Sequence, residues 1–115
     1  MASARFEEQS LDGATGAVIV TGELDMTNTG DLRRHVDALL ANGLARVVID
    51  LSDLTHMDSS GLAELLSALE RTRDRDGGLA LVVTSPMIKR TLEVRGVDGL
   101  FNIADTREQA RVSLL

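Results

Sequence analysis

Two kinds of hydrophobic pattern alternate along this chain. Short unbroken runs of aliphatic and β-branched residues predict buried strands, whereas apolar residues spaced three and four apart predict amphipathic helices. Unbroken runs at residues 17–21, 46–51 and 79–83 predict three strands. A weaker stretch at residues 3–10 and a short one at 101–103 predict edge strands, and the first of these can pair with the 17–21 strand as a hairpin.

Helical spacing fills the intervals between these strands. Residues 27–29 offer caps for a first helix, and Gly43 follows it as an expected left-handed end residue. The buried stripe of this helix consists of Leu32, Val36, Leu39 and Leu40. A second helix is predicted from about residue 60 to residue 75. Its buried stripe consists of Leu62, Leu65, Leu66 and Leu69, and its expected solvated face of Arg71, Arg73 and Arg75.

Two further helices are marked by their first residues. Ser85 followed by Pro86 is a cap and a first helical position, and Thr106 with Gln109 has the spacing of a capping box. Two strands followed by alternating helices and strands imply crossover connections and a largely parallel sheet. The expected fold class is therefore α/β. We expect one compact domain over residues 1–115, with a four- or five-stranded, mostly parallel sheet and about four helices.

Composition narrows the function classes. Apolar residues make up 43% of the 115 residues, which is enough for a core, but Phe6 and Phe101 are the only aromatic residues, so stacked bases have almost no platform. The net charge of −6 disfavours nucleic-acid binding. No apolar run approaches the ~20 residues of a membrane span, and there are no cysteines. We therefore expect a cytoplasmic protein that binds neither nucleic acid nor membranes directly.

The polar stretch at residues 56–62, His-Met-Asp-Ser-Ser-Gly-Leu, joins the 46–51 strand to the second helix. The first amide groups of a helix lack partners within it, and Asp58, Ser59 and Ser60 are all residue types that cap such an end. Local geometry alone accounts for one cap. The functional alternative is a hydroxyl group displayed at the positive end of a helix, where a phosphate can be added without forcing the fold apart.

Catalytic interpretations of these residues are weaker. A nucleophilic serine needs a base within hydrogen-bond reach, but His35 lies beside the stripe of the first helix, where a packing role is favoured, and His56 lacks a G-x-S-x-G turn.

Acidic residues near the carboxyl ends of the strands raise a second chemical hypothesis, a magnesium-binding receiver domain with a phosphate-accepting aspartate. They are Asp25, Asp50, Asp53 and Asp58. A receiver domain has a paired acidic motif after its first strand, which is absent here, and a lysine directly after a late strand. Lys89 instead lies within the helix that Ser85 and Pro86 begin, so solvated turn carboxylates are favoured. We expect no enzyme, no cofactor and no metal site.

Several segments at these spacings resemble the STAS domain family, and within it the bacterial anti-sigma factor antagonists. They are residues 22–25 (Gly-Glu-Leu-Asp), 48–52 (Val-Ile-Asp-Leu-Ser), 57–62 (Met-Asp-Ser-Ser-Gly-Leu), 77–83 and Ser85-Pro86. The block at 57–62 after the Val-Ile-Asp-Leu strand is the most specific part, and the Gly-Glu-Leu-Asp turn is much less so. The resemblance extends from about residue 4 to residue 112.

This resemblance implies a phosphorylation switch. The serine directly after the aspartate, Ser59, is the implied phosphorylation site, and Ser60 corresponds to a second serine that is usually not the main acceptor. The implied kinase is the partner itself, an anti-sigma factor that uses Mg-ATP. Unphosphorylated antagonist binds it and frees the sigma factor, phosphorylated antagonist is released, and a separate phosphatase resets Ser59. Asp25 matches the family's turn aspartate near the partner surface.

The expected docking patch combines the 22–28 loop, the 56–61 turn and the start of the second helix. The partner-binding residues are Asp25, Asp58, Ser59, Ser60 and Gly61. A second hypothesis stays open, in which the chain is a non-phosphorylated STAS module. Such a module would act as a small-ligand or nucleotide sensor, or as a subunit of a larger signalling or lipid-transport complex.

Overall fold

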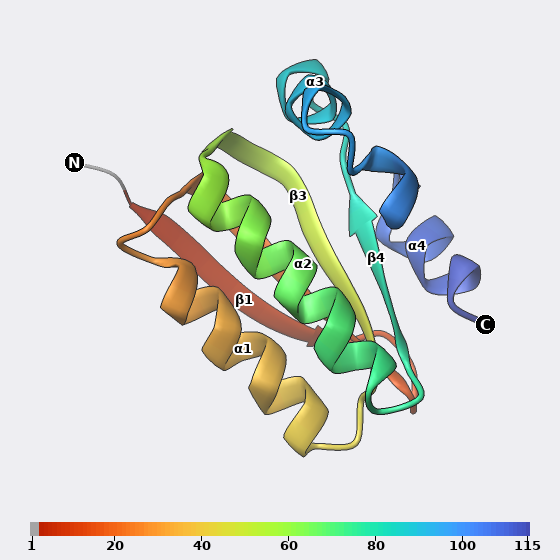
Figure 1. Cartoon of the computed structure of the whole chain (residues 1–115). Coiled ribbons are helices and arrows are strands. Elements are labelled where there is room, and N and C mark those ends of the chain that lie inside the picture. Colours follow the sequence, from red (N-terminus) through yellow and green to blue (C-terminus); the bar gives the residue numbers. More distant parts are fainter. Residues whose placement is uncertain (1–2) are drawn as a thin grey trace.

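The computed structural model describes residues 3–115, which build a five-stranded sheet (Figure 1). The strands lie side by side in chain order: β1 (Ala4–Ser10), β2 (Thr15–Leu24), β3 (Arg46–Met57), β4 (Gly78–Val82) and β5 (Asn102–Ala104). β1 is antiparallel to β2, as the predicted hairpin requires, and β2 to β5 run parallel. The expected α/β fold with a mostly parallel sheet is thus confirmed.

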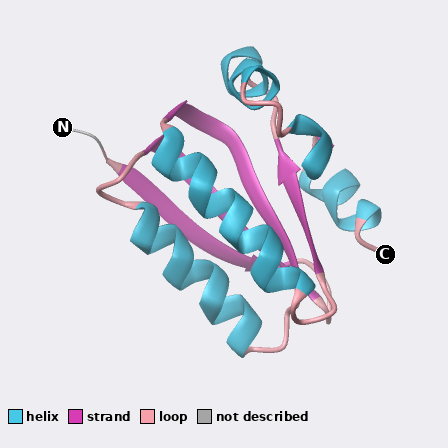
Figure 2. Cartoon of the chain, in the orientation of Figure 1, coloured by secondary structure: helices cyan, strands magenta, loops and turns pink. Residues whose placement is uncertain are grey.

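Helices cover both faces of this sheet and one of its ends (Figures 1 and 2). They are α1 (Thr29–Ala41), α2 (Ser59–Arg73), α3 (Pro86–Val94) and α4 (Arg107–Ser113), with a 3₁₀ turn at Asp98–Leu100. α1 and α2 lie side by side over one face, and α4 packs on the other. α3 sits across the end of the sheet where β3 finishes. Within residues 3–115, none of the helices has the length and apolar character needed to cross a membrane.

The core is aliphatic and divided by the sheet. Alternate residues of β3 point to opposite faces, so Val47, Ile49 and Leu51 join the large cluster beneath α1 and α2, whereas Val48 joins a smaller cluster beneath α4. Full burial of such a side chain contributes about 1.5–3 kcal/mol. The stripe predicted for the first helix, Leu32, Val36, Leu39 and Leu40, is buried as expected.

β3 is longer than the sequence predicts, and this changes the geometry at its end. The unbroken apolar run stops at Leu51, yet the strand continues to Met57, because β2 runs beside it until Leu24 pairs with Met57. Leu54 and Met57 are buried, and the polar residues between them lie mostly exposed. The connection between β3 and α2 is therefore a single residue, Asp58, and not the long turn that the sequence predicts.

One predicted solvated face is wrong in part. Arg71 lies between α1 and α2, where its guanidinium group is 3.0 Å from a carboxylate oxygen of Glu64 and 3.0 Å from one of Asp37. Its side chain is only 18% exposed. The packing prediction for His35 agrees with the structure, because its ring stacks on Phe6 at a centroid distance of 5.4 Å. These contacts fix α1 against α2 and against β1.

Candidate functional site

The structure brings the predicted site residues together at one end of the sheet, where β2 and β3 finish and α2 begins. Ser59 is the first residue of α2 and its side chain is exposed, whereas Ser60 is half-buried and Gly61 is buried. Asp25 directly follows β2. Because β2 and β3 are parallel neighbours, the two loops that follow them emerge at the same edge.

Asp58 fixes the direction in which α2 starts. One oxygen of its carboxylate, Oδ1, accepts hydrogen bonds from the amides of Ser60 at 2.9 Å and Gly61 at 3.1 Å. These are two of the amides that a helix start leaves without partners. The amide of Asp58 in turn donates to the carbonyl oxygen of Leu24 at 3.2 Å. The start of α2 is therefore tied to the end of β2, and Ser59 is held in a defined position between them.

Gly61 allows α2 to approach the strand ends closely. A Cβ atom at this position would lie 2.6 Å from Cγ of Met57 and 3.1 Å from the side chain of Leu24. Both distances are shorter than ordinary van der Waals contact, so any larger residue would push the first turn of α2 away from the sheet. The glycine is needed here for this packing and not for its backbone angles, because Gly61 has an ordinary helical conformation.

The loop after β2 is braced by Asn28. Its side-chain oxygen accepts from the amide of Asp25 at 3.0 Å, and its side-chain nitrogen donates to the carbonyl oxygen of Glu23 at 2.8 Å. The residue is only 7% exposed and makes no side-chain cap for α1. Asn28 is thus a positioning residue that the sequence analysis missed, because an asparagine before a helix normally indicates a cap.

Asp25 is held in its ionised form. The hydroxyl and the amide of Thr27 donate to one oxygen of its carboxylate, at 2.5 Å and 2.8 Å respectively. These two bonds, and to a smaller extent the charge of His56, lower the pKa of Asp25 below its ordinary value. The edge of the sheet where α2 begins therefore carries a negative charge at neutral pH.

Two other acidic residues of the predicted set are engaged in local contacts. Asp50 lies 3.1 Å from the guanidinium group of Arg107 in α4, and Ser52 donates to its other oxygen. Oδ1 of Asp58 accepts the two hydrogen bonds that cap α2. Among the residues that the structure describes, no three histidine or acidic side chains are placed to hold a metal ion. The expectation of solvated turn carboxylates is wrong for Asp50, which lies within β3 and is only 5% exposed.

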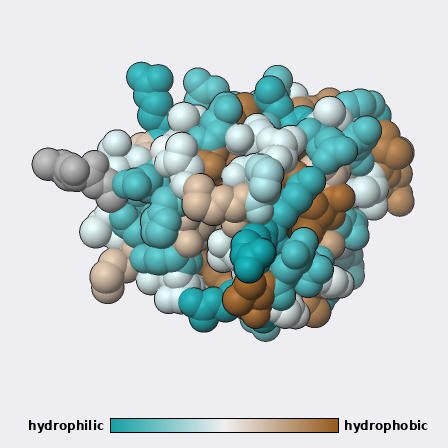
Figure 3. All heavy atoms as spheres, turned by 90° about the horizontal axis from the view of Figure 1, so that it is seen from above, coloured by the Kyte–Doolittle hydropathy of each residue, from teal (hydrophilic) through white to brown (hydrophobic). Residues whose placement is uncertain are grey.

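An open groove of about 510 Å³ separates the start of α2 from α3. Met57, Asp58 and Ser59 line one side, and Met87, Thr91, Val94 and Arg95 are among the residues lining the other. Only Ile88 and Leu92 of α3 are buried, so Met87 is 56% and Val94 72% exposed, although the sequence analysis gave no role to this surface. Figure 3, which looks down on this end, shows brown apolar side chains interleaved with polar ones. Met26, at the tip of the loop after β2, is 76% exposed.

The fold and this site define a small regulatory module of the STAS type. The STAS domain model matches residues 8–110, and the chain belongs to the STAS domain family. The chain is 29% identical over 88% of its length, and 89% of the relative, to BtrV of Bordetella bronchiseptica, a protein named as an anti-sigma factor antagonist.

Solved structures agree with this assignment. A crystal structure of an anti-sigma factor antagonist from Mycobacterium paratuberculosis superposes with a TM-score of 0.85 at 26% identity, covering 97% of this chain and 94% of that one. The Bacillus cell fate determinant SpoIIAA in its phosphorylated form shares the fold, with a TM-score of 0.73 at 21% identity, covering 95% of this chain and 98% of that one.

Proposed function

We propose that this protein is an anti-sigma factor antagonist that works by partner switching. The unphosphorylated form binds an anti-sigma factor that is also a serine kinase, and the sigma factor is released. The kinase transfers the γ-phosphoryl group of Mg-ATP to Oγ of Ser59, which loses its proton, and ADP leaves. The phosphorylated protein then dissociates, and a phosphatase restores the hydroxyl group by hydrolysis. This proposal places the protein in the cytoplasm, where sigma factors act.

One observation carries the proposal: the side chain of Ser59 is exposed at the first turn of a helix whose geometry is fixed on both sides. Ser60, its neighbour, is half-buried. A kinase can therefore reach one of the two adjacent serines more readily than the other. The exposed methionines Met26 and Met87 flank this end of the molecule, and methionine side chains adapt readily to a partner's surface.

The electrostatics supply the switch. In a complex that covers Ser59, a phosphate would be desolvated beside the carboxylates of Asp25 and Asp58. A buried charge without a partner costs several kcal/mol. A loss of ~3 kcal/mol weakens binding more than a hundredfold. In the free protein the same phosphate lies at the exposed, positive end of α2, where it is tolerated. We therefore expect a large change in affinity with a small change in the free fold.

The experiment is phosphorylation of the purified protein by the anti-sigma factor kinases of its source organism with Mg-ATP, followed by mapping of the phosphate by mass spectrometry. We expect one phosphate, at Ser59. Ser59→Ala should abolish the label, and Ser60→Ala, a matched change at the adjacent serine, should retain it. Label that persists in Ser59→Ala would refute the assignment.

Binding gives the second measurement. Titration calorimetry with the labelling kinase should show at least hundredfold weaker binding of Ser59→Asp than of the unsubstituted protein. The thermal midpoint of free Ser59→Asp should stay close to that of the unsubstituted protein, because the new charge lies at a helix N-terminus. Equal affinity for the two proteins would show that charge at residue 59 does not control the complex.

A further inference from the structure

The groove beside Ser59 has a positive side. Arg90 and Arg95 of the α3 segment both line it, opposite Asp58 and Ser59. Both arginines are exposed, and neither takes part in an ion pair within 4.0 Å among the residues that the structure describes. The other titratable side chains that line this groove are those of Asp58 and His56. The α3 side of the groove therefore carries two guanidinium groups that no described carboxylate neutralises.

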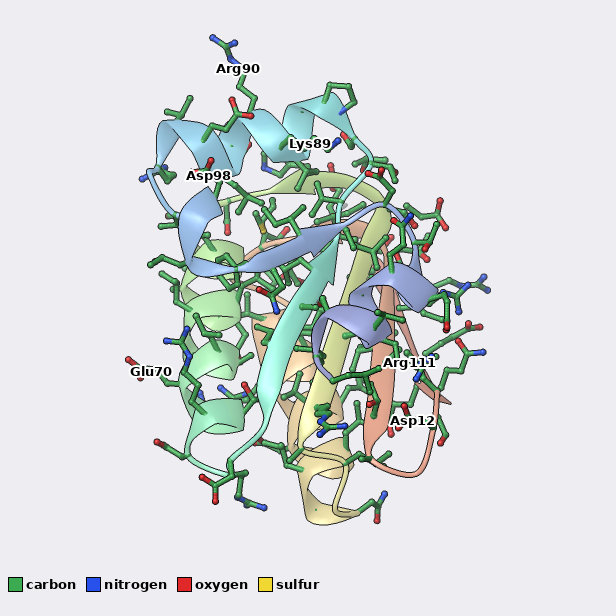
Figure 4. The ribbon with its side chains drawn as sticks, turned by 90° about the vertical axis from the view of Figure 1, so that its right-hand side faces the viewer. Asp12, Glu70, Lys89, Arg90, Asp98 and Arg111 are labelled. Atoms are coloured by element: carbon green, nitrogen blue, oxygen red, sulfur yellow. The ribbon has the colours of Figure 1, made fainter. Side chains whose placement is uncertain are left out.

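The two arginines lie on opposite flanks of the α3 face that lines the groove. At about 100° per residue, Arg95 leaves the helix roughly 40° from Thr91, and Arg90 leaves it roughly 40° from Val94 on the other flank. The side chain of Arg90 extends away from the molecule in Figure 4. Arg95 is therefore the better placed to reach across the groove.

A phosphate on Ser59 would need such a donor. The amides of Ser60 and Gly61 already donate to Asp58, so these two donors at the start of α2 are not available to a phosphate. The neighbouring carboxylates of Asp58 and Asp25 repel it. Arginine pairs with phosphate through two parallel hydrogen bonds, which makes it the side chain best suited to this task.

We propose that Arg95 is the internal binding site for the phosphate of phosphorylated Ser59. This inference rests on the proposed function, since it concerns the state that the kinase produces. The ion pair bridges the groove from α2 to α3 and occupies the space between them. Phosphorylation then acts on the partner twice, by adding charge to Ser59 and by closing the groove beside Met87 and Val94.

The test does not depend on the natural kinase. Phosphoserine is incorporated at position 59 during translation, and the second ionisation of the phosphate is titrated by phosphorus NMR in the otherwise unsubstituted protein, in Arg95→Gln and in Arg73→Gln. Arg73 is an exposed arginine at the far end of α2, about 21 Å along the helix axis from Ser59. Its replacement removes the same charge at a distance beyond the screening length of about 8 Å.

We expect the phosphate pKa to be about 0.5 higher in Arg95→Gln than in the unsubstituted protein, the size of an exposed ion pair, and unchanged in Arg73→Gln. The Nε–H signal of Arg95 should also move between the serine and phosphoserine proteins. Equal phosphate pKa values in Arg95→Gln and the unsubstituted protein, or an equal rise in Arg73→Gln, would overturn the inference. Failure of the kinase to label Ser59 would instead refute the proposed function and leave this titration intact.

Discussion

Replacement of the Asp58 cap tests whether this residue sets the start of α2. Asp58→Ala removes both acceptor bonds, to the amides of Ser60 and Gly61, at a half-buried position. Loss of a helix cap costs about 0.5–2 kcal/mol, and two bonds at the first turn of a core helix favour the upper half of that range. For 115 residues, an unfolding entropy of about 2.1 cal/mol/K per residue converts 1–2 kcal/mol into a fall of roughly 4–8 °C in the thermal midpoint.

The assay is thermal unfolding followed by circular dichroism, with Asp58→Asn as the matched control. Asparagine keeps the acceptor oxygen and loses only the charge at the helix N-terminus, which is worth about 0.3–1 kcal/mol. We expect Asp58→Asn to lose less than half as much as Asp58→Ala. A midpoint for Asp58→Ala within about 1 °C of the unsubstituted protein would refute the capping argument. Equal losses in the two variants would assign the effect to charge instead.

Two further predictions concern the opposite end of the molecule. Gly77→Ala should cost about 3 kcal/mol or more in urea unfolding, because its Cβ would lie 1.9 Å from the carbonyl oxygen of Ala45. Gly99→Ala, with nothing within 4 Å of the new atom, should change stability by less than about 0.5 kcal/mol, and similar losses in both would contradict the steric argument. The amide of Ala14 and then the guanidinium group of Arg111 (Figure 4) lower the pKa of Asp12 from 3.8 to about 2. A lowered folded-state pKa gives stability that is present above pH 3.8 and lost as the pH falls to about 2. The thermal midpoint of the unsubstituted protein should therefore drop more steeply than that of Asp12→Asn between about pH 4 and pH 2, and parallel curves would contradict this.

The order of elements could be predicted from the sequence because local pattern and tertiary environment agree. Strands buried on both faces are unbroken apolar runs, and the helix ends at Gly43, Ser85 and Thr106 carry residues whose backbone angle or side-chain bond defines the end. The end of β3 could not be predicted. In its last part the buried residues Leu54 and Met57 are three positions apart, so the alternation of buried and exposed residues that indicates a strand is absent, and pairing with β2 defines the strand.

The candidate site was predictable only where it is local. The polar run that contains Asp58 and Ser59 is contiguous, so its position before an amphipathic stripe indicates a helix start. Arg95 and Met87 are distant from Ser59 in sequence and line the same groove only because α3 packs across the end of the sheet. Arg71 was misjudged for the same reason, since its partner Asp37 belongs to another helix.

The double role of the Asn28 amide group has a consequence for genetics. Its two bonds hold the chain on both sides of Leu24, although the side chain itself is nearly inaccessible to any other molecule. A screen that selects mutants unable to engage the partner would therefore recover changes at this hidden residue together with changes at surface residues. A map of the contact area drawn from such mutants alone would therefore include buried residues. The solvent accessibility of each position then separates the residues that contact the partner from the buried residues that position them.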